Sequence, residues 1–273
     1  MLAGPGMFRG PPIAVNRKGE SMSTIAEAAR ERLFSPSISL GNGLKRVGAS
    51  VARTLLPPTC CLCGARGQAP DLDLCEVCVT LLPVNAPTGN TSSLFAATLV
   101  RVVVPFHYAY PVDHLIRALK FRGERVYARV LGTLLAHSLS AMWPQPQLIV
   151  PIPLHARRYR ERGFNQALEI ARFAAAPLGI AVDSRCLVRR TPTLEQSGLS
   201  LAKRKRNVRG AFAATRRMNG ERVAIVDDVL TTGSTALAAA QALLAAGVGE
   251  VELWAVARAP RDSLPRSPQS PGG

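Results

Sequence analysis

The chain has 273 residues, 47% of them hydrophobic, which is enough for one large domain or two modest ones with a buried core. Its formal net charge of +16, from 34 Lys and Arg against 18 Asp and Glu, favours phosphate-rich partners, either small diphosphates or nucleic acid. No stretch approaches the ~20 consecutive apolar residues of a membrane span, and the N-terminus lacks the apolar segment of a signal peptide, so we expect a cytoplasmic protein.

The N-terminal part of the chain lacks a sustained hydrophobic pattern. Residues 1–43 mix Gly, Pro, Ser and charged residues, and we expect a disordered tail there, in which Met22 is weighed as an alternative start of translation. From Leu44 to Leu56 apolar residues recur at helical spacing, and Pro57 and Pro58 follow. This pattern predicts a short amphipathic helix that stops at the prolines.

Five of the six cysteines lie between Cys60 and Cys78, which in a cytosolic protein indicates a metal site rather than disulfides. Four of these five cysteines form two C-x-x-C pairs, which are separated by eleven residues. Four thiolates at this spacing can close a tetrahedral zinc site, and the predicted ligands are Cys60, Cys63, Cys75 and Cys78. Cys61 is an alternative to Cys60, with poorer chelating geometry. Because no histidine or open ligand position is nearby, we expect a structural site.

The residues after the cysteines predict an irregular connection and then two strands and a helix. Residues 98–104 are strongly β-prone, and the alternating pattern of 106–110 predicts an antiparallel strand. The helix that follows has Asp113 as its candidate N-cap. Near its end, Lys120 and Arg122 are by default solvated cations, and the alternative is that they face an anionic ligand.

An arginine-rich segment follows the next predicted strand, which spans residues 147–153 and ends at prolines. Four arginines occur within six residues, from Arg157 to Arg162. Guanidinium groups pair bidentately with phosphate oxygens, so we interpret the segment as a loop that binds diphosphate, with one or two of its arginines solvated. A helix is predicted next, over residues 166–176, and a further strand over 181–188.

Residues 189–209 form a basic, polar stretch with two interpretations. One is a disordered basic run, and the other is a partly ordered lid over a phosphate ligand. Leu199 and Leu201 interrupt the charges and favour the lid. At the end of the chain, residues 259–273 are rich in Pro, Ser and Arg, and we expect a second disordered tail.

The most informative stretch runs from Arg222 to Thr235 and predicts a strand, a loop and then a helix over residues 236–246. Asp227 and Asp228 fall at the carboxyl end of a buried strand, where open α/β sheets place their ligands. The loop after them carries hydroxyl groups and one glycine: Thr231, Thr232, Gly233, Ser234 and Thr235. Its free N–H groups suit a phosphate, and the carboxylates suit ribose hydroxyls, with a divalent cation if diphosphate is present. The alternative is an ordinary strand end in which Ser234 caps the helix.

The order of these motifs resembles the ComF family of competence-related, phosphoribosyltransferase-like proteins. After the two C-x-x-C pairs come Ala-Leu-Lys-Phe-Arg-Gly at 118–123, Pro-Ile-Pro-Leu at 151–154, Arg-Gly-Phe-Asn-Gln at 162–166 and the acidic-pair loop. The match covers about residues 45–258. The acidic-pair loop alone is typical of the type I phosphoribosyltransferases, whereas the Arg-Gly-Phe-Asn-Gln segment and the cysteine pairs narrow it to this family.

The resemblance implies the fold class and the organisation of the chain. We expect an α/β domain over residues 95–258, with the parallel sheet and flanking helices of a type I phosphoribosyltransferase. A small zinc-ribbon-like module with four cysteine ligands, together with its preceding helix, is expected over residues 44–83.

The resemblance also implies roles for individual residues. Asp227 and Asp228 would be catalytic and hold the ribose hydroxyls, and Thr231 to Thr235 would bind the 5-phosphate. Magnesium would enter with the diphosphate, and Gln196 to Arg206 would be the mobile loop. The diphosphate loop would include His155, Arg157 and Arg162.

Two functions follow from these expectations. The first is binding of phosphoribosyl diphosphate with magnesium and transfer of the phosphoribosyl group to a nitrogen acceptor. The alternative is a non-catalytic competence factor for DNA uptake, which binds single-stranded DNA and a helicase-like partner.

Overall fold

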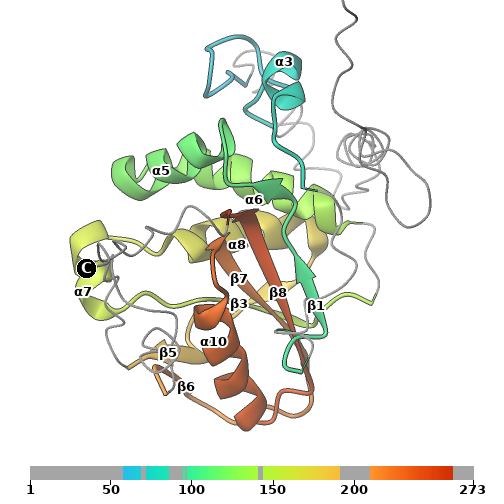
Figure 1. Ribbon diagram of the computed structural model, residues 1–273, viewed down its shortest axis with the longest axis vertical. Coiled ribbons are helices and arrows are strands. Elements are labelled where there is room, and N and C mark those ends of the chain that lie inside the picture. Colours follow the sequence, from blue (N-terminus) through green and yellow to red (C-terminus); the bar gives the residue numbers. More distant parts are fainter. Residues whose placement is uncertain are drawn as a thin grey trace, which may run out of the picture.

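The computed structural model describes residues 58–68, 72–85, 95, 97–140, 144–190 and 210–260 (Figure 1). Several sequence predictions lie outside these residues: the tail over 1–43, the helix over 44–56, the lid within 191–209, and all but two residues of the tail over 259–273.

The centre of the molecule is a six-stranded parallel sheet with the order β1-β8-β7-β3-β4, in which β2 also pairs with β8. The two longest strands, β7 and β8, lie side by side in it. The strands are β1 Arg101–Val103, β2 Phe106–His107, β3 Leu148–Pro151, β4 Ala181–Val182, β7 Arg222–Leu230 and β8 Glu250–Arg258. This architecture confirms the predicted α/β class with a parallel sheet flanked by helices.

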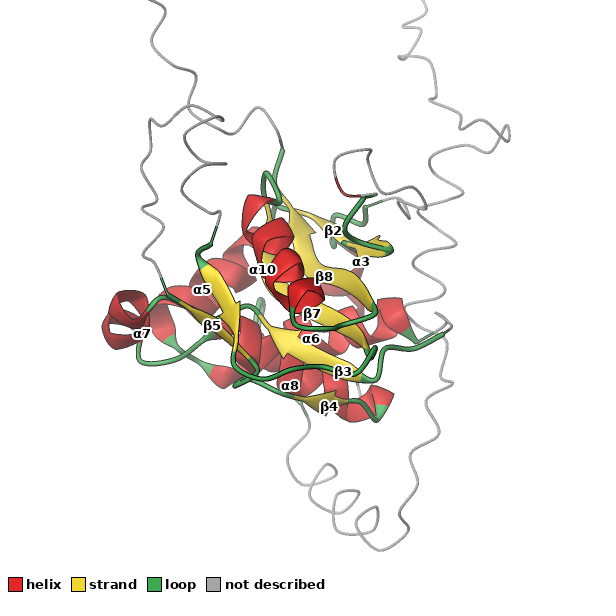
Figure 2. Cartoon of the chain, turned by 90° about the horizontal axis from the view of Figure 1, so that it is seen from below, coloured by secondary structure: helices red, strands yellow, loops and turns green. Residues whose placement is uncertain are grey.

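Helices cover both faces of the sheet, and strand β7 shows how the sequence directs them. Val223 and Ile225 pack in the cluster beneath helix α10 (Ser234–Ala245), whereas Ala224 and Val226 pack in the cluster beneath the opposite helices. Such a continuous apolar run is typical of a strand buried on both faces. Figure 2 shows α10 on one side of the sheet and α6 and α8 on the other. The opposite helices are α5 Val112–Arg122, α6 Arg125–Leu139 and α8 Gln166–Leu178.

The cysteine-rich module packs against the α5–α6 side of the domain. It includes the short helix α3 (Glu76–Thr80), which lies beyond α5 and α6 in Figure 1. Leu74 and Leu82 are buried in the same cluster as the helices. The buried Asp73 carboxylate accepts two hydrogen bonds from Arg129 of α6, at 2.6 and 2.8 Å, so a partly buried ion pair also joins the module to the domain.

Three predictions about local structure are wrong or incomplete. The segment predicted as an antiparallel strand pairs parallel with β8 at Phe106 and His107, next to the residues of β8 that pair with β1. Antiparallel pairing is limited to an isolated bridge between Phe106 and Val84. Helix α5 begins after Pro111, so Asp113 lies in its first turn and is not its N-cap. Residues 181–188 split between β4 and the strand β5 (Leu187–Arg189), which forms an antiparallel pair with β6 (Phe212–Ala214) beside α10.

Across the described residues, no helix combines the length and the apolar character that a membrane crossing requires.

Candidate functional site

The predicted strand, loop and helix around the acidic pair are present in the structure. A small hollow opens where β7 passes into α10, and Asp227, Thr231, Gly233 and Thr235 contribute its polar wall and backbone. Helix α10 begins at Ser234, two residues before the predicted start, because Gly233 with a φ of 76° serves as its N-cap. The N-terminus of a helix, a loop of hydroxyl groups and a carboxylate therefore meet at the carboxyl end of a central strand.

Gly233 is required by its surroundings as well as by its backbone angle. A Cβ atom at this position would lie 2.3 and 2.4 Å from two ring carbons of Phe95, which is buried over the loop. The neighbouring hydroxyls of Thr232 and Ser234 lie 3.0 Å apart and form a hydrogen bond with each other. The loop is thus held in shape by local contacts. Nothing in the sequence around Phe95 indicated that it covers this loop.

Asp228 is paired with a lysine that sequence reasoning treated by default as a solvated cation. The Lys120 ammonium group lies 2.5 Å from Asp228 Oδ2, and the side chains are 24% and 6% exposed. Lys120 comes from the last turn of α5, on the opposite side of the sheet from α10. Lys120 is therefore not a solvated cation, and the anion that it faces is a carboxylate of the protein. A contact between residues so far apart in the chain leaves no local pattern.

The three charged groups shift one another's pKa in different directions. Burial raises the pKa of Asp227 well above its usual range, and the charge of Asp228 raises it further. Burial also opposes the charged form of Asp228, but the charge and hydrogen bond of Lys120 outweigh it and lower the pKa of Asp228. For Lys120, the two carboxylates likewise outweigh burial and raise its pKa. Asp228 and Lys120 therefore form the charged pair, and Asp227 is the group that takes up a proton more readily.

The arginine-rich segment is a helix, α7 (Ala156–Arg162), and not the predicted loop. His155 is its N-cap, and the imidazole Nδ1 accepts a hydrogen bond from the N–H of Arg157 at 3.3 Å. Gly163, with a φ of 81°, ends it. Ala, Arg and Glu are good helix formers, so the segment folds as a helix between these two caps.

The chain that follows α7 is held at the carboxyl end of β3 by Asn165. Asn165 is buried, its Nδ2 group donates to the carbonyl of Ile152 at 3.1 Å, and its Oδ1 accepts from Ala167 N–H at 3.0 Å. Because β3 lies parallel to β7, its carboxyl end is at the same sheet edge as Asp227. The helix α7, with His155 as its N-cap and with Arg157 and Arg162 in it, therefore follows the strand next to β7.

The two predicted diphosphate arginines already have partners. Arg157 pairs with Glu161 at 2.8 Å on the exposed surface of α7, where such a pair is weak and exchangeable. Arg162 donates to Gln166 Oε1 at 2.6 Å. Thus the structure gathers Asp227, Thr231, Gly233 and Thr235 in one hollow, whereas the α7 residues are not part of its lining.

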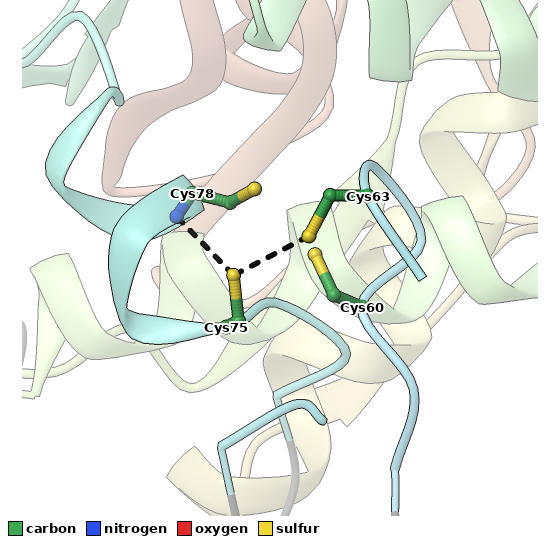
Figure 3. A group of neighbouring side chains, drawn as sticks. All are labelled: Cys60, Cys63, Cys75 and Cys78. Carbon is green, nitrogen blue, oxygen red and sulfur yellow. Dashed lines mark hydrogen bonds between the residues drawn. The ribbon is translucent and has the colours of Figure 1, made fainter. Parts of the chain in front are cut away.

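The four predicted zinc ligands converge. The Sγ atoms of the set Cys60, Cys63, Cys75 and Cys78 all lie within 4.8 Å of one another, and those of Cys63 and Cys75 are 3.5 Å apart. Figure 3 shows their sulfur atoms turned toward one another. Tetrahedral zinc with bonds of ~2.3 Å requires sulfur atoms about 3.8 Å apart, so the cluster fits this metal.

The structure also decides between Cys60 and Cys61. Cys60 belongs to the cluster, whereas Cys61 packs against the hydrophobic core. Burial opposes ionisation of Cys60, but backbone hydrogen bonds, first from Cys75, lower its pKa to about 6. Burial raises the pKa of Cys61 to about 12. These pKa directions do not decide the assignment, because burial also raises the pKa of Cys78, which belongs to the cluster. The position of its sulfur atom assigns Cys60 as the ligand.

Comparison with known proteins agrees with this arrangement. The model of the phosphoribosyl transferase domain matches residues 166–268. The DNA utilization protein YhgH of Salmonella typhi is 34% identical over 222 residues, which cover 74% of this chain and 98% of that protein. The protein of the same name from Escherichia coli K12 is 37% identical over 163 residues, covering 58% and 72%. Competence protein F of Haemophilus influenzae is 34% identical over 171 residues, covering 58% and 73%. The chain belongs to the ComF family, and its four-cysteine module precedes a phosphoribosyltransferase-like domain.

Proposed function

We propose that the protein binds phosphoribosyl diphosphate together with magnesium and transfers the phosphoribosyl group to a nitrogen acceptor. The observation that supports this most strongly is the hollow at the end of β7, where Asp227 and the loop from Thr231 to Thr235 lie together at a helix N-terminus. Backbone N–H groups at such a terminus bind phosphate, and the adjacent carboxylate suits the hydroxyls of a ribose.

We assign the parts of the ligand to different predicted residues. The loop N–H groups and hydroxyls bind the 5-phosphate, and Asp227 accepts hydrogen bonds from the ribose hydroxyls. Asp228 lies behind it, in contact with Lys120. The diphosphate is bound by His155, Arg157 and Arg162, which belong to α7 and its N-cap. Magnesium would be held by diphosphate oxygens and would neutralise part of their charge.

Transfer requires positioning rather than a nucleophilic side chain. The bond between C1 of the ribose and the diphosphate oxygen breaks, the diphosphate leaves with the electron pair, and the acceptor nitrogen forms the new bond to C1. The protein's contribution is to hold C1 near the acceptor and to stabilise the leaving charge with the donors of α7.

Calorimetric titration with phosphoribosyl diphosphate and magnesium tests the binding step. We expect saturable binding by the wild type and at least about tenfold weaker binding by Asp227→Asn, because a hydrogen bond to a charged acceptor is lost. Arg117→Met, on the exposed face of α5, is the control. Binding that Asp227→Asn leaves unchanged would remove the site assignment. Transfer is then tested by diphosphate release across a panel of nitrogen acceptors.

A second candidate function is binding of single-stranded DNA during DNA uptake, without catalysis. It is favoured by the relatives named DNA utilization protein and Competence protein F, and by the net charge of +16. A helicase-like partner would belong to the same process. The affinity for a single-stranded oligonucleotide should fall steeply as salt rises, because phosphate contacts release counterions. An absence of binding at low salt would exclude this function.

A further inference from the structure

The ion pair between Lys120 and Asp228 is not explained by the roles proposed above. Asp227 lines the hollow, whereas Asp228 is engaged from behind by α5. The Asp228 side chain is only 6% exposed, and the ammonium nitrogen lies 2.5 Å from its carboxylate. Asp228 is therefore turned toward a cation of the protein itself, in a place where water screens charges poorly.

The negative charges of Asp227 and Asp228 would repel an anionic ligand in the hollow. Phosphoribosyl diphosphate carries several negative charges, and two adjacent carboxylates would repel them. The groups that face Asp228 are Asp227 from its own strand and Lys120 from α5, and Tyr108 lies near the lysine. Of these, Lys120 supplies the positive charge that offsets the repulsion.

We propose that Lys120 is a positioning residue of the site, which neutralises Asp228 so that an anionic sugar diphosphate can bind beside Asp227. This inference rests on the proposed function, since it concerns the same hollow. The two acidic residues then have different roles. Asp227 contacts the ligand, and Asp228 forms the ion pair with Lys120.

A set of charge variants tests this division. We would titrate the wild type, Lys120→Met, Asp228→Asn, the double variant and Lys120→Arg with phosphoribosyl diphosphate and magnesium, and separately with inorganic diphosphate. Lys120→Met should bind both at least about tenfold more weakly, because a buried carboxylate is left without its cation. The double variant should return to within about threefold of the wild type, because neither charge remains. Lys120→Arg should retain binding.

The matched control is Arg117→Met, which also removes a cation from α5. Arg117 is 58% exposed and pairs with Asp113 rather than with the acidic pair, so its removal should not change the affinity. Thermal unfolding of every variant checks folding. The double variant keeps the test valid if Lys120→Met folds poorly, because removing both members of a buried ion pair is often neutral for stability.

A pH profile separates charge neutralisation from a merely structural role. In Lys120→Met, Asp228 has lost its cation and should take up a proton at a higher pH than in the wild type. Binding by Lys120→Met should therefore recover as the pH is lowered, relative to the double variant, in which residue 228 does not ionise.

Three results would overturn the inference. Wild-type affinity in Lys120→Met would show that the charge does not matter, while leaving the proposed function intact. A double variant as weak as Lys120→Met would show that Lys120 contacts the ligand directly. A wild type that binds neither phosphoribosyl diphosphate nor inorganic diphosphate would overturn the inference and the proposed function together.

Discussion

In the cysteine module, four thiols converge on one point, whereas at the end of β7 two carboxyl groups are adjacent and only that of Asp228 is paired with Lys120. The module is closed: three of its four cysteines are buried, and its neighbours belong to the α5–α6 cluster. The last residues of β7 lie where the parallel strands end, and they face a hollow. One cluster can be completed by a single metal ion, and the other holds Asp227, whose pKa is raised by burial and by the charge of Asp228.

This difference predicts opposite signs for the effect of substitution on stability. Structural zinc contributes directly to folding, so loss of a ligand should destabilise the protein. A binding site that holds like charges together is strained, so neutralising one of them should stabilise the fold while it weakens binding.

The largest expected effect is the loss of a zinc ligand. Cys78→Ser should abolish stoichiometric zinc and lower the free energy of unfolding by several kcal/mol, because the module that packs against α5 and α6 would lose the stabilisation that a structural metal gives. The measurements are metal content by mass spectrometry and thermal unfolding. Cys61→Ser is the matched control, since Cys61 lies outside the cluster and should leave the zinc content at one per chain. Equal zinc loss in both variants would contradict the ligand assignment.

An intermediate effect is expected in the loop at the end of β7. Gly233→Ala places a methyl group 2.3 Å from the Phe95 ring at a positive φ, and we expect a loss of about 1–3 kcal/mol of stability. Gly163→Ala has a similar φ, with no heavy atom within 4 Å of the added Cβ, so it isolates the cost of the backbone angle, about 1 kcal/mol. Denaturant unfolding compares the two. Equal losses would mean that Phe95 does not constrain the loop.

The smallest effect has the opposite sign. The pKa of Asp227 is raised in the folded protein, mainly by burial and then by Asp228. A carboxyl group with a raised pKa destabilises the fold at neutral pH, and this penalty disappears as the pH falls below the unfolded value of about 3.9. Asp227→Asn should therefore unfold at a temperature a few degrees above that of the wild type at pH 7, with the difference vanishing near pH 4. A difference that stays constant with pH would contradict the charge explanation.

The two regions also differ in how well the sequence predicted them. The zinc ligands follow from spacing alone, because both halves of the site are local C-x-x-C turns, although only the structure separates Cys60 from Cys61. The strand, loop and helix around Asp227 are likewise local, and they were predicted to within two residues. The contacts that the sequence did not predict are tertiary contacts. Lys120 and Phe95 reach the loop region from distant parts of the chain, and no local pattern marks such contacts.

The arginine segment shows a different limit. Its charge indicated anion binding, and that prediction is untested, but the same charge was interpreted as a loop although the residues favour a helix. Gly163 after the segment is a usual signal for the end of a helix, whereas His155, which caps its start, is not a usual N-cap residue, so the start of the helix is not marked in the sequence.

The central claim is that the end of β7 binds a diphosphate sugar through Asp227. The most direct test is the thermal unfolding of the wild type and Asp227→Asn at pH 7, with and without phosphoribosyl diphosphate and magnesium. We predict that the ligand raises the unfolding temperature of the wild type and has little effect on Asp227→Asn, which starts from the higher value. An equal ligand-induced shift in both proteins, or no shift in the wild type, would contradict the claim.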